Sequence, residues 1–152
     1  MLHLHPYLGS DPRMVNLLSD RMAATFVEAW IFVNHGTRSS AGEIFTEQLT
    51  ATLARWLQVP VIPASWSVAP GLSDRARTLI ERGHQRIGIF SYFLFPGGIP
   101  DAIDQAVDAL CQTYPTVQFF PTPPLSVGAG LVNLLQAIVS WEMHLPGQAI
   151  AP

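Results

Sequence analysis

A run of apolar, β-prone residues that stops abruptly at a polar turn limits this chain to few folds. Residues 29–39 read AWIFVNHGTRS, and the apolar run ends at Asn34, before His35, Gly36 and Thr37. Such a run is typical of a buried strand that is followed by a loop at its carboxyl end. In an open α/β sheet, ligands bind in the crevice outside the carboxyl ends of the strands. We therefore expect His35 to be held rigidly at a cleft.

Short apolar strands alternate with amphipathic helices along the rest of the chain. Strands are predicted at residues 29–34, 61–66, 87–93 and 117–120, and helices at residues 12–24, 40–57, 73–82, 100–113 and 129–143. This alternation predicts an α/β fold with a four-stranded parallel sheet, right-handed crossovers and helices on both faces. If the first strand is central, the loops after the first and third strands face each other. His35 would then lie opposite Pro96, Gly97 and Gly98.

Local signals mark several of the predicted helix ends. Asp11 and Pro12 are typical of a helix start, because proline is favoured in the first turn. Ser40 and Glu43 have the spacing of a capping box. Gly83 stands where a helix often ends in a left-handed residue.

The composition restricts the possible partners. The 152 residues suffice for one domain with a sizeable core. Hydrophobic residues make up 49% of the chain and charged residues 12%, which predicts a surface partly covered by another subunit. A net charge of −3 provides no basic stripe for nucleic acid. The single cysteine, Cys111, fits a reducing cytoplasm, and the longest apolar run, residues 87–96, is too short to cross a membrane.

A stretch near the start of the chain is similar to a stretch near its end. Residues 5–22 (HPYLGSDPRMVNLLSDRM) align with residues 122–139 (TPPLSVGAGLVNLLQAIV), and the matches are Pro6, Leu8, Val15, Asn16, Leu17 and Leu18. The spacing is that of one α/β unit, so we expect residues 1–24 to be the tail of a preceding repeat, residues 25–144 an α/β domain and residues 145–152 a flexible tail. The alternative to a repeat is that two amphipathic helices resemble each other by chance. A helix left over from a missing repeat is also a candidate for a dimer interface.

The order of the motifs resembles the small sirohydrochlorin chelatases of the CbiX and SirB type. The shared pattern is a strand with an HGT loop, a helix, a strand followed by SWSVAP, a helix ending in ERGHQRI, a strand that runs into SYFLFPGG, and TPPL before a last helix. The YFLF-x-G segment, together with the HG turn, is the most specific part. The resemblance covers roughly residues 29–140. It implies a chelatase-like three-layer domain, equivalent to the C-terminal repeat of a two-repeat member.

Members of this family insert cobalt, iron or nickel into a carboxylate-rich tetrapyrrole, on the route to cobalamin or sirohaem. The resemblance implies a metal chelatase (a lyase) that takes the divalent metal as a substrate, has no tightly bound cofactor, and acts as a homodimer or paired with another chelatase-like repeat. It also implies a His in the first loop, an acid after the second strand and a second His after the F-L-F-x-G turn. His35 matches the first position, whereas Ser67 and Ile99 occupy the others. The alternative is a catalytically impaired repeat that binds a tetrapyrrole or serves as a structural or assembly module.

The chemistry of imidazole makes His35 the candidate catalytic and metal-binding residue. Imidazole has an unperturbed pKa of about 6.5, and its neutral form can hold a divalent ion or accept a pyrrole proton. In a chelatase the tetrapyrrole itself supplies nitrogen ligands, so one His is enough to contact the metal. The alternative is that His35 is a structural residue bonded to nearby backbone, since metal sites in proteins usually have several ligands from the protein.

The candidate substrate-binding residues surround the expected crevice, where N–H and hydroxyl groups can donate hydrogen bonds to carboxylates. They are Gly36, Thr37, Arg38, Ser67, Pro96, Gly97 and Gly98. The glycines have an alternative explanation in tight turns that require positive φ. The alternative for Ser67 is that it simply ends the second strand.

Overall fold

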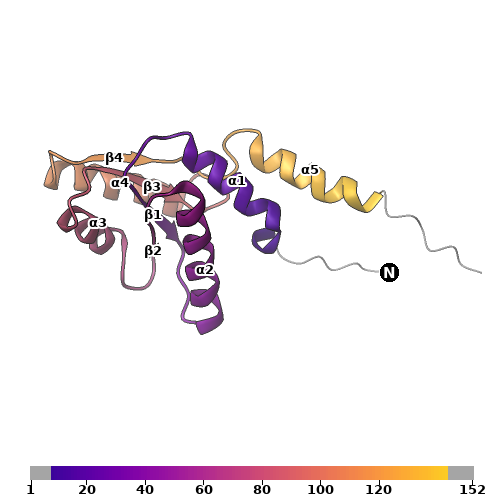
Figure 1. The fold of residues 1–152 in the computed structure, drawn as a ribbon, viewed down its shortest axis with the longest axis horizontal. Coiled ribbons are helices and arrows are strands. Elements are labelled where there is room, and N and C mark those ends of the chain that lie inside the picture. The colour runs from indigo at the N-terminus through magenta and orange to yellow at the C-terminus, as the bar shows by residue number, and fades with distance from the viewer. Residues whose placement is uncertain (1–7, 144–152) are drawn as a thin grey trace, which may run out of the picture.

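Four parallel strands form the centre of the fold, in the order β2-β1-β3-β4 (Figure 1). The computed structural model describes residues 8–143, except for the side chains of residues 141–143. The strands are β1 Ala29–Asn34, β2 Val61–Ser65, β3 Arg86–Ser91 and β4 Gln118–Pro121. The predicted α/β class and the four parallel strands are confirmed, and β1 has a central place in the sheet, which was the condition for its loop to face that of β3. The predicted tail at residues 145–152 lies outside the described residues.

Helices cover both faces of this sheet, as predicted. They are the 3-10 helix η1 Leu8–Ser10 and the α-helices α1 Pro12–Ala23, α2 Ser40–Leu57, α3 Leu72–Glu81, α4 Gly98–Thr113 and α5 Gly130–Met143. Two ends differ from the prediction by two residues, because β3 ends at Ser91 and α4 begins at Gly98, and the other ends agree to within one residue. Among the described helices, none combines the length and apolar character that a membrane span requires.

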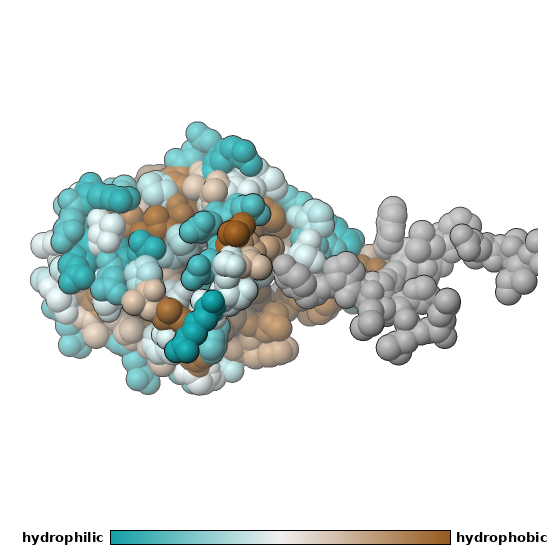
Figure 2. All heavy atoms as spheres, turned by 90° about the horizontal axis from the view of Figure 1, so that it is seen from below, coloured by the Kyte–Doolittle hydropathy of each residue, from teal (hydrophilic) through white to brown (hydrophobic). Residues whose placement is uncertain are grey.

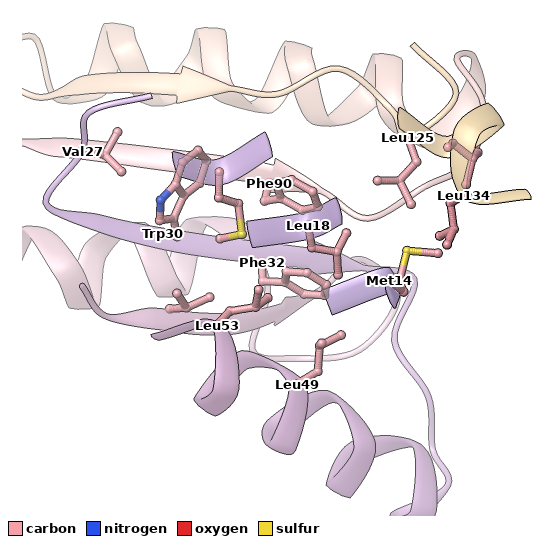
Figure 3. Close-up of a cluster of buried hydrophobic side chains, with 13 residues drawn as sticks. Met14, Leu18, Val27, Trp30, Phe32, Leu49, Leu53, Phe90, Leu125 and Leu134 are labelled. Atoms are coloured by element: carbon pink, nitrogen blue, oxygen red, sulfur yellow. The ribbon is translucent and has the colours of Figure 1, made fainter. Parts of the chain in front are cut away.

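Each face of the sheet has its own hydrophobic core, because successive strand residues point to opposite sides. On one face, Trp30, Phe32 and Phe90 pack against α1 and α2 (Figure 3). The helix residues buried there are Met14, Leu18, Met22, Leu49 and Leu53. On the other face, Ile31 and Ile89 pack against α3 and α4. The result is a three-layer domain.

The centre of the first core is a group of aromatic rings on β1 and β3. The Phe32 and Phe90 rings stack with centroids 5.6 Å apart, and the Tyr92 ring lies 4.9 Å from that of Phe32. The Trp30 indole covers Gly88, where a Cβ atom would lie 2.2 Å from Cε3 of the indole. The strand can pass beneath this ring only because residue 88 has no side chain.

Helix α1 packs on the sheet of its own chain. Met14, Leu18 and Met22 are at most 2% exposed. The apolar face that was a candidate for a dimer interface is therefore part of the internal core. Helix α5, which the similarity between residues 5–22 and 122–139 pairs with α1, lies beside it (Figure 1). Figure 2 shows that hydrophobic side chains on the face viewed there lie in small groups among hydrophilic ones.

Two of the three predicted helix caps are confirmed. The Asp11 carboxylate accepts a hydrogen bond from the Arg13 amide at 2.9 Å, and Gly83 has a φ of 92°. The capping box predicted at Ser40 and Glu43 is wrong. The N-cap residue of α2 is Ser39, and its side chain makes no capping hydrogen bond. Its amide donates instead to Oγ1 of Thr37 at 3.0 Å, so the preceding loop fixes the helix start.

Candidate functional site

The loop after β1 is held tightly against the end of β2. Gly36 has a φ of 92°, and a Cβ atom there would lie 2.8 Å from Cβ of Ser65 and 3.1 Å from Oγ of Ser67. Both the conformation and the close approach therefore require glycine at this position. A Cβ atom on Gly42 of α2 would lie 2.6 Å from Cγ2 of Thr37, so the loop also packs closely on α2.

The backbone of His35 is anchored, whereas its side chain is exposed. Its carbonyl oxygen accepts hydrogen bonds from the Ser67 amide at 3.0 Å and from Oγ of Ser67 at 2.7 Å. Among the described residues, the hydrogen-bond contact of the imidazole is the one between Nδ1 and the Gly36 carbonyl oxygen, at 3.4 Å. Such a length indicates a weak bond. Ser67 thus positions the backbone of His35 and leaves the ring available to a ligand.

An open cavity of about 560 Å³ lies where β1 and β3 end. The loop after β1, helix α2 and the segment after β3 line it together, so the predicted meeting of these two loops is present. The polar part of the lining contains Asn34, His35, Thr37 and Thr46. The apolar wall is formed mainly by Phe45, Leu49, Phe93, Leu94 and Phe95. Leu94 and Phe95 are 43% and 67% exposed, so this wall can make contact with an apolar ligand.

The predicted site residues divide into two groups. Gly36 and Thr37 line the cavity together with His35. Arg38, Ser67, Pro96, Gly97 and Gly98 lie outside its lining. Gly97 and Gly98 have φ values of 104° and 45°, and at both positions a Cβ atom would meet nothing within 4 Å. Their conformations fit the turn into α4, which was the alternative explanation for these glycines.

Asn34 is a site residue that the sequence pattern had not singled out. It lines the large cavity and also a smaller one of about 140 Å³ between α2 and the segment after β2. Its Nδ2 donates to Oγ1 of Thr46 at 3.1 Å, whereas its buried Oδ1 has no partner among the described residues. A polar residue that closes an otherwise apolar strand is the signal that could have identified it.

Glu43 and Glu47 of α2 also line the smaller cavity, beside Arg75. Nε of Arg75 donates to the Pro63 carbonyl oxygen at 2.8 Å. Within the described part of the chain, no three side chains of His, Cys, Asp or Glu lie close enough together to hold a metal ion. His35 is therefore flanked by hydroxyl, amide and apolar groups rather than by further metal ligands.

Comparisons with known proteins agree with this architecture. A family model, CbiX, matches residues 29–140. A protein of Marinobacter aquaeolei VT8 assigned to cobalamin (vitamin B12) biosynthesis as CbiX has a similar structure, with a TM-score of 0.63 and 15% identity over 78% of this chain and 96% of that chain. SirB from Bacillus subtilis, solved with Fe³⁺, gives a TM-score of 0.60 and 20% identity over 86% of this chain and 53% of that chain. No curated protein matches the sequence.

Proposed function

The chain belongs to the CbiX family, and on that premise we propose that it is a sirohydrochlorin chelatase-like enzyme. It inserts a divalent metal ion, cobalt, iron or nickel, into a tetrapyrrole during cobalamin or sirohaem biosynthesis in the cytoplasm. The observation that carries the proposal is the exposed His35 ring at the edge of an open cavity, on a loop that Gly36 and Ser67 hold in place.

The insertion reaction requires little covalent chemistry from the protein. The metal ion replaces two pyrrole N–H protons of the tetrapyrrole, and these protons must be accepted. We propose that the His35 imidazole at the cavity either accepts a proton or holds the ion until the tetrapyrrole nitrogens replace it. Both roles need an imidazole that can reach the ligand, which suits a ring whose contact with the Gly36 carbonyl oxygen is weak.

The walls of the cavity suit the two chemical parts of such a substrate. Leu94 and Phe95 offer apolar surface to the macrocycle. The first amides of α2 and the exposed Arg38 guanidinium are donors for peripheral carboxylates. A volume of about 560 Å³ falls in the range of small-molecule sites. The cavity is open, so part of the tetrapyrrole would remain outside it.

A homodimer, or pairing with another chelatase-like repeat, belongs to the same proposal. The similarity between residues 5–22 and 122–139 supports it, and the chain spans about half the length of the SirB chain with which it aligns. A second unit would then face the open side of the cavity and contact the exposed part of the substrate.

The proposal is tested by following metal insertion into sirohydrochlorin by absorbance, with Co²⁺, Fe²⁺ and Ni²⁺ in turn. The purified protein should accelerate insertion over a protein-free control. His35→Ala should reduce that acceleration by about 100-fold or more, since general acid–base groups contribute rate factors of this order. His84→Ala is the matched control, because His84 lies between α3 and β3, away from the cavity, and should leave the rate unchanged. No acceleration with any of the three metals would overturn the catalytic proposal.

Ser67 and Ile99 favour a second candidate function, because the family resemblance implies an acid and a His at these positions. In that case the chain binds a tetrapyrrole without inserting metal, or serves as an assembly module. Spectral titration with sirohydrochlorin separates these possibilities. Binding without insertion identifies an impaired repeat, and the absence of binding identifies a structural module.

A further inference from the structure

Arg21 of α1 binds a segment that lies more than a hundred residues further along the chain. Its Nη1 donates to the Leu125 carbonyl oxygen at 2.8 Å, and its Nη2 donates to the carbonyl oxygens of Val127 and Pro124 at 2.8 and 3.3 Å. One guanidinium therefore joins three backbone oxygens of residues 124–127, which connect β4 to α5. Hydrogen bonds with a charged donor are among the stronger ones in proteins.

The other side of the same segment holds the apolar wall of the cavity. The Leu125 amide donates to the Phe93 carbonyl oxygen at 2.8 Å, and the Ser126 amide donates to that of Leu94 at 2.8 Å. Phe93 and Leu94 line the cavity. The side chain of Leu125 is 2% exposed and points into the core near Met14 (Figure 3). Residues 124–127 thus lie between Arg21 and the cavity wall and are hydrogen-bonded to both.

The wall depends on this support because it lies beyond the end of the sheet. Strand β3 ends at Ser91, and its pairing with β4 ends at Ile89. The Tyr92 amide still donates to the Val33 carbonyl oxygen at 2.9 Å. Beyond this point, the carbonyl oxygens of Phe93 and Leu94 accept their backbone hydrogen bonds from residues 125 and 126. Burial of the Arg21 guanidinium lowers its pKa, which agrees with its partly desolvated position under this segment.

We propose that Arg21 is a positioning residue for the ligand site: by holding residues 124–127, it fixes Phe93 and Leu94 in the place where they contact the bound macrocycle. This inference rests on the proposed function for the identity of the ligand. It assigns to α1 a role at the site, although α1 contributes no residue to the lining of the large cavity.

The test compares Arg21→Gln and Arg21→Lys with the wild type in two measurements. The first is amide hydrogen exchange of Leu125 and Ser126, whose N–H groups bond the wall directly. The second is the dissociation constant of sirohydrochlorin from spectral titration. Arg21→Gln should accelerate the exchange of both amides and weaken binding about tenfold, which corresponds to the loss of one or two charged hydrogen bonds. Arg21→Lys keeps the positive charge but lacks the planar guanidinium that bonds several carbonyl oxygens at once, so its effects should be intermediate.

Arg86→Gln is the matched control for a general loss of stability. Nη2 of Arg86 donates to the Phe26 carbonyl oxygen at 3.1 Å, but at the opposite end of the sheet. This variant should unfold more easily than the wild type while keeping the wild-type dissociation constant and the wild-type exchange of Leu125 and Ser126.

The two measurements separate the inference from the proposed function. If the wild type binds sirohydrochlorin and Arg21→Gln binds it equally well, the positioning role is wrong while the proposed function stands. If the wild type does not bind, the proposed function is wrong, and exchange at Leu125 and Ser126 still decides whether Arg21 fixes the wall. Unchanged exchange of these amides in both Arg21 variants would overturn the inference.

Discussion

Gly36 and Gly83 have the same φ angle but different surroundings. Both have a φ of 92°, yet a Cβ atom would lie 2.8 Å from Cβ of Ser65 at Gly36 and would meet nothing within 4 Å at Gly83. Alanine at Gly83 should therefore cost only the conformational strain, about 1 kcal/mol. Alanine at Gly36 adds a steric clash, and we expect a total loss of about 3 kcal/mol. Urea unfolding of both variants measures the difference directly.

Equal losses for the two alanine variants would contradict the close packing of the loop on β2. A further result is expected from Gly36→Ala in the insertion assay. Because Gly36 follows His35 directly, the displaced loop should also reduce the rate of insertion, whereas Gly83→Ala should not.

The position of His35 was predicted better than its surroundings were. His35 could be predicted because a polar turn after a buried strand marks the edge of the sheet where ligands bind. The place of Phe93 and Leu94 in the cavity wall could not be predicted, since their carbonyl oxygens are bonded by the amides of residues 125 and 126, far away in sequence. The hydrogen bond from Oγ of Ser67 to the His35 carbonyl oxygen could not be predicted either, because it joins two loops that are distant in sequence.

Glu28, just before β1, ties the start of that strand to the start of β3. Its carboxylate accepts hydrogen bonds from the amides of Gln85 at 2.7 Å and Arg86 at 3.2 Å. These bonds lower its pKa below the ordinary value of 4.5. The folded state therefore favours the ionised form. The resulting stabilisation is complete above the unfolded pKa and is lost as the pH falls through the folded pKa.

Glu28→Gln should consequently lower the free energy of unfolding at neutral pH, and its difference from the wild type should shrink as the pH falls from about 5 to about 3. Urea unfolding across this range measures the effect. Glu81→Gln, on an exposed residue at the end of α3, provides the matched substitution. A difference for Glu28→Gln that stays constant down to about pH 3 would show that these hydrogen bonds do not stabilise the fold.

Most elements could be predicted because each carries its own pattern, whereas the strand order β2-β1-β3-β4 was expected only on the condition that the first strand is central. The end of β3 could not. Tyr92 and Phe93 are as β-prone as the strand before them, but the pairing with β1 ends at Ser91 and the pairing with β4 ends at Ile89. The bounds of α2 were predicted correctly, but its cap was not, because the Ser39 amide is bonded to Oγ1 of Thr37 and no capping box forms.

The two cores of the molecule are joined through shared strands. Trp30 and Phe32 belong to one core, while Ile31 and Val33, which alternate with them on β1, belong to the other. Loss of either core would remove the packing on one face of the same strand. We therefore expect one cooperative unfolding transition, in which urea midpoints from tryptophan fluorescence and from far-UV circular dichroism coincide. Two separate midpoints would indicate that the α1 and α2 layer unfolds independently of the α3 and α4 layer.

The contact between Trp30 and Gly88 restricts how sequences with this fold can diverge. The two residues are paired on neighbouring strands, and the indole occupies the space that any side chain at position 88 would need. Neither position can therefore vary independently. In a library randomised at both, a residue larger than glycine at position 88 should survive selection for folding only together with a smaller residue at position 30. The pair would be inherited as one unit even though 58 positions separate its members along the chain.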